Sequence, residues 1–280
     1  MLLRCGSHTL DLSRPVVMGI LNVTPDSFSD GGEYGDFDCA VSHALRMVEE
    51  GAGIIDVGGE STRPGAHAVP AEEEIRRVTP VIEALARRID VPVSVDTSKP
   101  SVMAAALHAG ASMINDVRAL QEPGALEVAA RSNAAICLMH MRGEPRTMQS
   151  EPHYTDVVGE VRGFLVARST ACAEAGISGD RLAIDPGIGF GKRFDHNLVL
   201  LAAVPALVDL QLPVLIGVSR KSMFGALLGR AVEERLAGGL AVAAAAVLAG
   251  ASIVRAHDVR ETVDAVKVAA ALRDAGYRTM

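Results

Sequence analysis

GAGIIDV, at residues 51–57, shows the pattern that decides the fold: a helix end, a Gly–Ala turn and a short apolar strand. The pattern returns as GASMINDV at 110–117 and as GASIVRAHDV at 250–259. The chain holds eight such β-rich runs, each bounded by turn residues: VVMGIL (16–21), GIIDV (53–57), VPVSV (91–95), SMIN (112–115), AAICLM (134–139), RLAID (181–185), PVLIGV (213–218) and SIVRA (252–256). Continuous apolar strands that alternate with helical segments are typical of a parallel sheet covered on its outer face.

Eight strand–helix units in 280 residues favour a closed (β/α)8 barrel, the TIM barrel, over an open doubly wound sheet. Such a barrel typically needs roughly 250 residues. We therefore expect one domain spanning residues 1–280, without a linker. The first dozen residues precede the first strand, and we expect them to form an N-terminal hairpin at the bottom of the barrel.

Composition excludes several classes of protein. Hydrophobic residues make up 49% of the chain, and the net charge of −7 argues against non-specific binding to nucleic acid. The four cysteines lie far apart and form no zinc-ligand spacing, which indicates reduced thiols. The N-terminus has no signal-peptide core, and the longest apolar stretch, 236–251, is shorter than a membrane span of ~20 residues. We expect a cytoplasmic protein without a membrane partner.

A polar residue follows each apolar run. Carboxylates and amides follow the early strands and cations follow the late ones: Asn22, Asp56 with Glu60, Asp96, Asn115 with Asp116, His140, Asp185, Ser219, and Arg255 with His257. In a parallel barrel the carboxyl ends of all strands open on one face, so these groups should converge on one mouth. Any one of them could be an ordinary loop residue or helix cap. Together they suit a polar heterocycle that carries an anionic group.

Four loops add further chemistry. NVTPDSFSDGG (22–32) and GGESTRPGA (58–66) are long, polar and glycine-rich, as loops that cover an active site commonly are. DPGIGFGK (185–192) lacks the spacing of a phosphate-binding P-loop, so its glycines indicate close approach to a flat ligand instead. SRKS (219–222) stands at the start of a helix, where backbone amides favour anions.

These motifs carry a family resemblance. In order, MGILNVTPDSFSDGG, DVGGESTRPGA, SVDTSKP, INDV, MHMRGEPRTMQ, DPGIGFGK, GVSRKS and RAHDV resemble the dihydropteroate synthases along nearly the whole chain. One departure is Ala256, where the family more often has Val or Thr. The resemblance implies condensation of 6-hydroxymethyl-7,8-dihydropterin pyrophosphate with p-aminobenzoate, giving 7,8-dihydropteroate and pyrophosphate in folate biosynthesis. It also implies a homodimer and a target of sulfonamides.

The resemblance assigns a role to each matching residue. The pterin would be held by Asp96, Asn115, Asp185, Lys221 and Arg255. The pyrophosphate would be held by Asn22, Thr62, Arg63, Arg255 and His257. The p-aminobenzoate would be framed by Phe28, Pro64, Phe190, Ser219, Lys221 and Ser222. The catalytic residues would be Asp96, Lys221, Arg63 and Arg255, with Asn22 also reaching a Mg²⁺ ion.

The chemistry fits these residue types. An aryl amine is a weak nucleophile, so pyrophosphate should leave before the amine attacks, and a carboxylate such as Asp96 can stabilise the positive charge that develops. Three alternatives remain open: a methyltetrahydrofolate-dependent methyltransferase, a non-catalytic pterin-binding barrel, and a phosphate-sugar isomerase or aldolase. The first has no use for the STRPGA and SRKS segments, the second should have damaged loops, and no lysine is placed for the Schiff base of an aldolase.

Overall fold

The structure is a computed structural model, and it describes residues 1–23, 32–61, 68–143 and 152–277. Eight parallel strands form one sheet in the order β8-β7-β6-β5-β4-β3-β10-β9. Their bounds are β3 Val16–Asn22, β4 Ile54–Gly58, β5 Val93–Asp96, β6 Met113–Asp116, β7 Ala135–Met139, β8 Leu182–Asp185, β9 Leu215–Gly217 and β10 Ile253–Ala256. A bridge between Ile184 of β8 and Val214, just before β9, closes the circle. The predicted (β/α)8 barrel is confirmed, and each strand lies within two residues of its predicted bounds.

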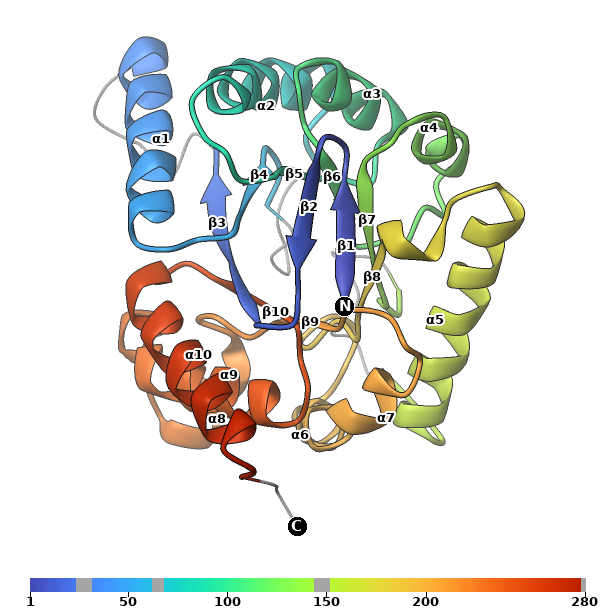
Figure 1. Ribbon diagram of the computed structural model, residues 1–280, viewed down its shortest axis with the longest axis vertical. Helices are drawn as coiled ribbons and strands as arrows, with labels where there is room; N and C mark the ends of the chain where they lie inside the picture. The colour runs from blue at the N-terminus through green and yellow to red at the C-terminus, as the bar shows by residue number, and fades with distance from the viewer. Residues whose placement is uncertain (24–31, 62–67, 144–151, 278–280) are drawn as a thin grey trace.

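Helices form a ring outside the strands (Figure 1). They are α1 Gly32–Glu49, α2 Ala71–Ala86, α3 Pro100–His108, α4 Ala125–Arg131, α5 Val157–Glu174, α6 Phe194–Ala202, α7 Val204–Val208, α8 Ser222–Leu228, α9 Leu236–Leu248 and α10 Val259–Asp274. Helix α2 shows why they dock: it buries Val78, Val81, Ile82 and Leu85 at helical spacing. These side chains join a continuous core between the helices and the outer face of the sheet.

The first residues form the expected hairpin. Strand β1 (Leu2–Cys5) pairs with β2 (His8–Asp11), and the hairpin crosses one end of the barrel (Figure 1). Leu3 and Cys5 are fully buried there, against side chains such as Met18 and Met113 that point into the barrel. The hairpin therefore fills the end of the barrel opposite the carboxyl ends of the strands.

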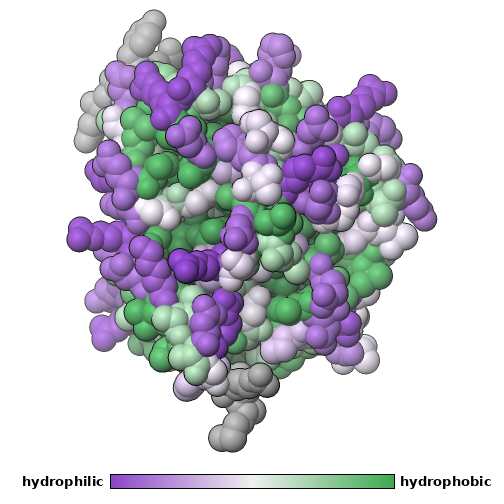
Figure 2. Space-filling view, viewed as in Figure 1, coloured by the Kyte–Doolittle hydropathy of each residue, from purple (hydrophilic) through white to green (hydrophobic). Residues whose placement is uncertain are grey.

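The outer surface is mixed in character. On the face seen in Figure 2, hydrophilic side chains are spread over the helices with apolar side chains between them. Within the part of the chain that the structure describes, no helix is long and apolar enough to cross a membrane.

Candidate active site

An arginine joins two carboxylates at the mouth of the barrel. Arg255, on β10, donates from Nε to Asp56 Oδ2 of β4 at 2.6 Å and from Nη2 to Asp96 Oδ2 of β5 at 2.7 Å. Asn115 of β6 donates from Nδ2 to the same Asp56 oxygen at 3.0 Å. Each side chain stands near the carboxyl end of its strand, so the closure of the barrel brings four separate segments together.

Both carboxylates keep an unused oxygen. Asp56 Oδ1 and Asp96 Oδ1 are buried and accept no hydrogen bond from any described residue. A buried acceptor without a donor costs roughly 1–3 kcal/mol, so such atoms need an explanation in a native protein. A ligand with N–H donors that entered this mouth could satisfy such acceptors.

Burial sets the protonation of this cluster. It raises the pKa of Asp96 to about 7, against the opposing effect of Arg255, and it raises the pKa of Asp185 against the opposing effect of Lys221. Burial disfavours the charge of Arg255 as well, but Asp56 and Asp96 outweigh it and raise its pKa. Arg255 therefore stays a cation, whereas Asp96 is poised to respond to whatever binds beside it.

The loop after β8 forms the opposite wall. Asp185 Oδ1 accepts from the backbone N–H of Gly187 at 2.7 Å, which fixes the start of the loop. Lys221 donates to the carbonyl of Ile188, and its Nζ lies 4.5 Å from the centre of the Phe190 ring. Burial lowers the pKa of Lys221 to about 8, although Asp185 opposes this. The loop thus presents an aromatic face beside a cation.

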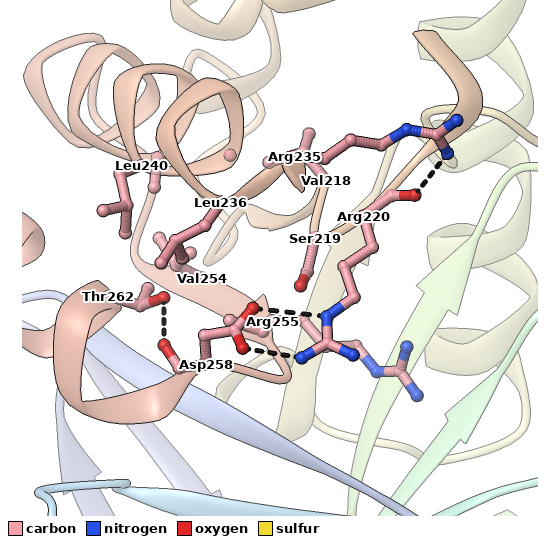
Figure 3. Close-up of a pocket in the computed structure, with 13 residues that line it drawn as sticks. Val218, Ser219, Arg220, Arg235, Leu236, Leu240, Val254, Arg255, Asp258 and Thr262 are labelled. Carbon is pink, nitrogen blue, oxygen red and sulfur yellow. Dashed lines mark hydrogen bonds and ion pairs between the residues drawn. The ribbon is translucent and has the colours of Figure 1, made fainter. Parts of the chain in front are cut away.

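The turn between β9 and α8 carries the SRKS motif. Arg220 adopts a left-handed backbone with φ of 59°, and its guanidinium pairs with Asp258 at 2.6 Å. Arg235 donates to the carbonyl of Arg220 at 3.1 Å, beside a small pocket between β9, β10 and α9 (Figure 3). These contacts hold the turn in place. On one side of it Ser219 Oγ lies 2.9 Å from Nδ1 of His257, and on the other Lys221 extends to the carbonyl of Ile188 in the loop after β8.

Most of the predicted residues come together. Asp96, Asn115, Asp185, Lys221 and Arg255 surround one mouth, where Asp185 also contributes to raising the pKa of Arg255. The remaining described ones lie at its edge: Asn22 at the end of β3, Phe190, the pair Ser219 and His257, and the exposed Ser222 at the start of α8. Phe28, Thr62, Arg63 and Pro64 lie outside the described residues.

Three residues of this region had no role assigned from the sequence: Asp56, His140 and Lys192. Asp56 and His140 were visible as polar strand ends, and Lys192 as the last letter of DPGIGFGK. Lys192 contacts His140, 52 positions away, and Asp56 contacts Arg255, 199 positions away, and no local signal reveals such partners.

Known proteins match this arrangement. The family model described as pterin binding enzyme matches residues 18–257. A dihydropteroate synthase from Escherichia coli K12 is 55% identical over 260 residues, covering 93% of this chain and 92% of that protein.

Solved structures agree with the sequence matches. A Xanthomonas albilineans dihydropteroate synthase with 4-aminobenzoic acid has a TM-score of 0.92 and 54% identity, covering 97% of this chain and 98% of that one. Another structure of the X. albilineans enzyme, in complex with 7,8-dihydropteroate, has a TM-score of 0.87 and 48% identity, with the same coverage. The chain therefore belongs to the pterin-binding enzymes and, among them, to the dihydropteroate synthases.

Proposed function

We propose that the chain condenses 6-hydroxymethyl-7,8-dihydropterin pyrophosphate with p-aminobenzoate, releasing 7,8-dihydropteroate and pyrophosphate in folate biosynthesis. The observation that carries the proposal is the pair of buried, unsatisfied oxygens on Asp56 and Asp96, held beside Arg255 in a chain of this family. The pyrimidinone edge of a pterin presents adjacent N–H donors, and such donors are what these oxygens lack.

The pterin would lie across the mouth of the barrel. Asp185 and Asp96 would accept from its N–H groups, Asn115 would contribute its amide, and Lys221 and Arg255 would donate to its ring acceptors. Charge-assisted hydrogen bonds of this kind are about twice as strong as neutral ones. Burial raises the pKa of Asp96 to about 7 and also raises that of Asp185, so N–H donors that bind beside these groups would favour their ionised, accepting form.

Bond breaking would precede bond formation. As the carbon–oxygen bond to pyrophosphate opens, positive charge appears on the pterin methylene and its conjugated ring. The described cluster sets three carboxylates, Asp56, Asp96 and Asp185, against two cations, Arg255 and Lys221. An excess of negative charge in a water-poor site stabilises a transition state in which the ring becomes positive. The amine of p-aminobenzoate, already unprotonated at neutral pH, then attacks the methylene, and its nitrogen loses one proton to solvent as the C–N bond replaces the broken C–O bond.

The leaving pyrophosphate would face the cationic side of the site. Arg255 and His257 lie on β10 and just beyond it, and Thr62 and Arg63 complete the proposed set. Asn22, half-buried at the end of β3, offers one neutral amide oxygen of the type that Mg²⁺ accepts. No group of three or more His, Cys, Asp or Glu side chains among the described residues could hold the ion. We propose pyrophosphate oxygens and water as its other ligands, and bound there it would offset the charge of the leaving group.

The p-aminobenzoate would pack on the loop after β8. The ring of Phe190 and the stem of Lys221 offer an apolar wall, and Ser219 and Ser222 offer hydroxyls for its carboxylate. Phe28 and Pro64 complete the proposed frame. The X. albilineans relative was solved with this compound, which supports an aminobenzoate subsite in this chain.

We also propose that residues 1–280 act as one domain, in a cytoplasmic homodimer. The four free cysteines suit a reducing compartment. Sedimentation equilibrium on the purified chain tests the dimer, which requires twice the 29.2 kDa mass of one chain.

The function is tested by mixing purified protein with the pterin pyrophosphate, Mg²⁺ and isotopically labelled p-aminobenzoate. We expect labelled dihydropteroate and pyrophosphate in equal amounts. Asp96→Asn should lose most of this activity, and Asp264→Asn, a change to an exposed carboxylate on α10, should keep it. Tight pterin binding without product would instead indicate a non-catalytic pterin-binding barrel.

A further inference from the structure

A buried lysine joins the loop after β8 to the end of β7. Lys192 is only 2% exposed, and its Nζ lies 2.9 Å from the carbonyl oxygen of Phe190, 3.0 Å from Nδ1 of His140 and 3.2 Å from the carbonyl oxygen of His140. Three acceptors match the three N–H donors of an ammonium group. No carboxylate lies among these three partners, so the contacts are those of a structural clip and not of a salt bridge.

Both the backbone and the ring of His140 are held by contacts. Its backbone N–H donates to the carbonyl of Asp185 at 2.9 Å, and its ring packs edge-on against Phe164, with 4.9 Å between the ring centres. Burial, with Lys192 nearby, lowers the pKa of His140 to about 3, so its ring stays neutral and Nδ1 can accept. Burial also lowers the pKa of Lys192 to about 7, while Asp185 favours its charged form.

The two segments approach so closely that only glycine fits between them. Gly187 and Gly191 have φ of 67° and 61°, and a Cβ on either would overlap a carbonyl oxygen, that of His140 or that of Arg142. The hydroxyl of Tyr154 donates to the carbonyl of Gly191 at 2.8 Å. The loop therefore packs directly on the end of β7. Lys192 donates to the carbonyls of His140 and Phe190, which this close approach would otherwise leave unpaired.

We propose that Lys192 and His140 are a positioning pair, which sets Phe190 and the loop after Asp185 in the geometry that p-aminobenzoate needs. Lys192 acts through the backbone of Phe190, whose ring lies against Lys221 on its other side. Lys192 hydrogen-bonds to none of the carboxylates assigned to the pterin, and the side chain of Asp185, whose charge it does feel, is held by the N–H of Gly187. The pair should therefore matter more for the aminobenzoate subsite than for the pterin ring. The proposal rests on the function proposed above.

The test compares Lys192→Met, which keeps the stem and removes the donors, with His140→Phe, which keeps the ring and removes Nδ1. For Lys192→Met we expect the KM for p-aminobenzoate to rise about tenfold or more because, of its three lost hydrogen bonds, the one to Phe190 acts on the aminobenzoate wall, and one buried hydrogen bond sets this scale. The dissociation constant of the pterin pyrophosphate should change less than about threefold on the same scale. His140→Phe should also raise the KM for p-aminobenzoate more than the dissociation constant of the pterin pyrophosphate, but by a smaller factor. The double variant should be no worse than Lys192→Met, because both changes break one unit.

Lys267→Met is the matched control, because Lys267 is exposed on α10, a helix that packs against α9, β3 and β10. Thermal melting establishes that each variant is folded at the assay temperature. A purely structural role would lower the melting temperature and leave the KM for p-aminobenzoate within twofold of the wild type, which would overturn the proposal. If Lys192→Met does not fold, His140→Phe decides on the same criterion. Absence of product from the wild type would instead refute the proposed function.

Discussion

Asp185 shows how one side chain can serve both the loop and the ligand. One of its oxygens already accepts from the N–H of Gly187 at 2.7 Å, and burial raises its pKa. Asp185→Asn keeps that acceptor but turns an N–H₂ group toward the donors of the pterin. Leaving a buried donor unpaired costs roughly 1–3 kcal/mol, so we expect pterin affinity to fall about tenfold or more. Calorimetric titration measures it; an unchanged dissociation constant would mean that Asp185 does not anchor the ring.

Asp96 should matter more for the rate than for binding. Positive charge appears on the pterin only as the bond to pyrophosphate breaks, so a carboxylate placed for that charge acts mainly in the transition state. We expect Asp96→Asn to lower kcat about a hundredfold or more, the scale of single electrostatic stabilisers. Single-turnover rate, pterin affinity and melting temperature should be measured on this one variant. A loss confined to affinity would make Asp96 an ordinary hydrogen-bond acceptor.

The structure removes one alternative for Asp96. A helix-capping role was conceivable, because any of the polar residues at the strand ends could cap the helix that follows. Helix α3 instead begins at Pro100 with Lys99 at its N-cap, and the backbone N–H of Lys99 bonds to Thr97 Oγ1 at 3.3 Å. The side chain of Asp96 instead accepts a hydrogen bond from Arg255. The effect of Asp96→Asn should therefore not come from a lost helix cap.

Among the elements, the N-terminal hairpin should contribute stability and not activity. Leu3 of β1 is fully buried at the end of the barrel opposite the site. Leu3→Ala leaves a cavity, and such changes cost about 2–5 kcal/mol. We expect the midpoint of guanidinium denaturation to fall accordingly, with kcat and KM unchanged at low temperature. Leu2→Ala, at a position 58% exposed, is the matched control and should change neither. A fall in kcat for folded Leu3→Ala would show that the N-terminal hairpin affects the active site at the other end of the barrel.

The elements were also the part that the sequence predicted best. Strands such as β7 read as five buried apolar residues between turns, so their type and approximate bounds follow from composition and periodicity. Their ends shift by a residue or two because hydrogen bonding to the neighbouring strand, and not local preference, decides where pairing stops. Asp96, for example, was expected just after a strand, but it belongs to β5 and pairs with Asn115 of β6.

At the scale of the whole molecule, local sequence patterns do not predict which distant side chains contact each other. Closure of the barrel was enough to predict that polar strand ends would meet, because every carboxyl end opens on one face. Which of them would pair was not predictable. Arg255 was expected at the pyrophosphate and the pterin, and it lies between two carboxylates 199 and 159 residues away. The buried state of Lys192 was equally invisible, since a lysine is almost never fully buried without such partners.

The buried lysines should make the free energy of unfolding of the whole fold depend on pH. Burial lowers the pKa of Lys192 to about 7, well below its ordinary value of 10.5. Between these values the unfolded chain binds more protons than the folded one, so this lysine makes the free energy of unfolding rise with pH. One proton accounts for at most about 1.4 kcal/mol per pH unit. Lys221, lowered to about 8, acts in the same direction but is present in every variant compared here.

Lys192→Met removes the titrating amine, so comparison with the wild type isolates the part of the pH dependence of unfolding that comes from Lys192. The free energy of unfolding of the wild type minus that of Lys192→Met should increase between pH 7 and pH 9, the two being measured by urea denaturation in matched buffers. The same difference taken with Lys267→Met, a change to an exposed side chain on α10, should stay flat over this range. The lowered pKa of His140 acts only below pH 6.5, where the charged imidazole of the unfolded chain begins to compete. A difference that stays flat from pH 7 to pH 9 would mean that Lys192 is a cation in both states throughout this range, with its pKa not lowered in the folded chain.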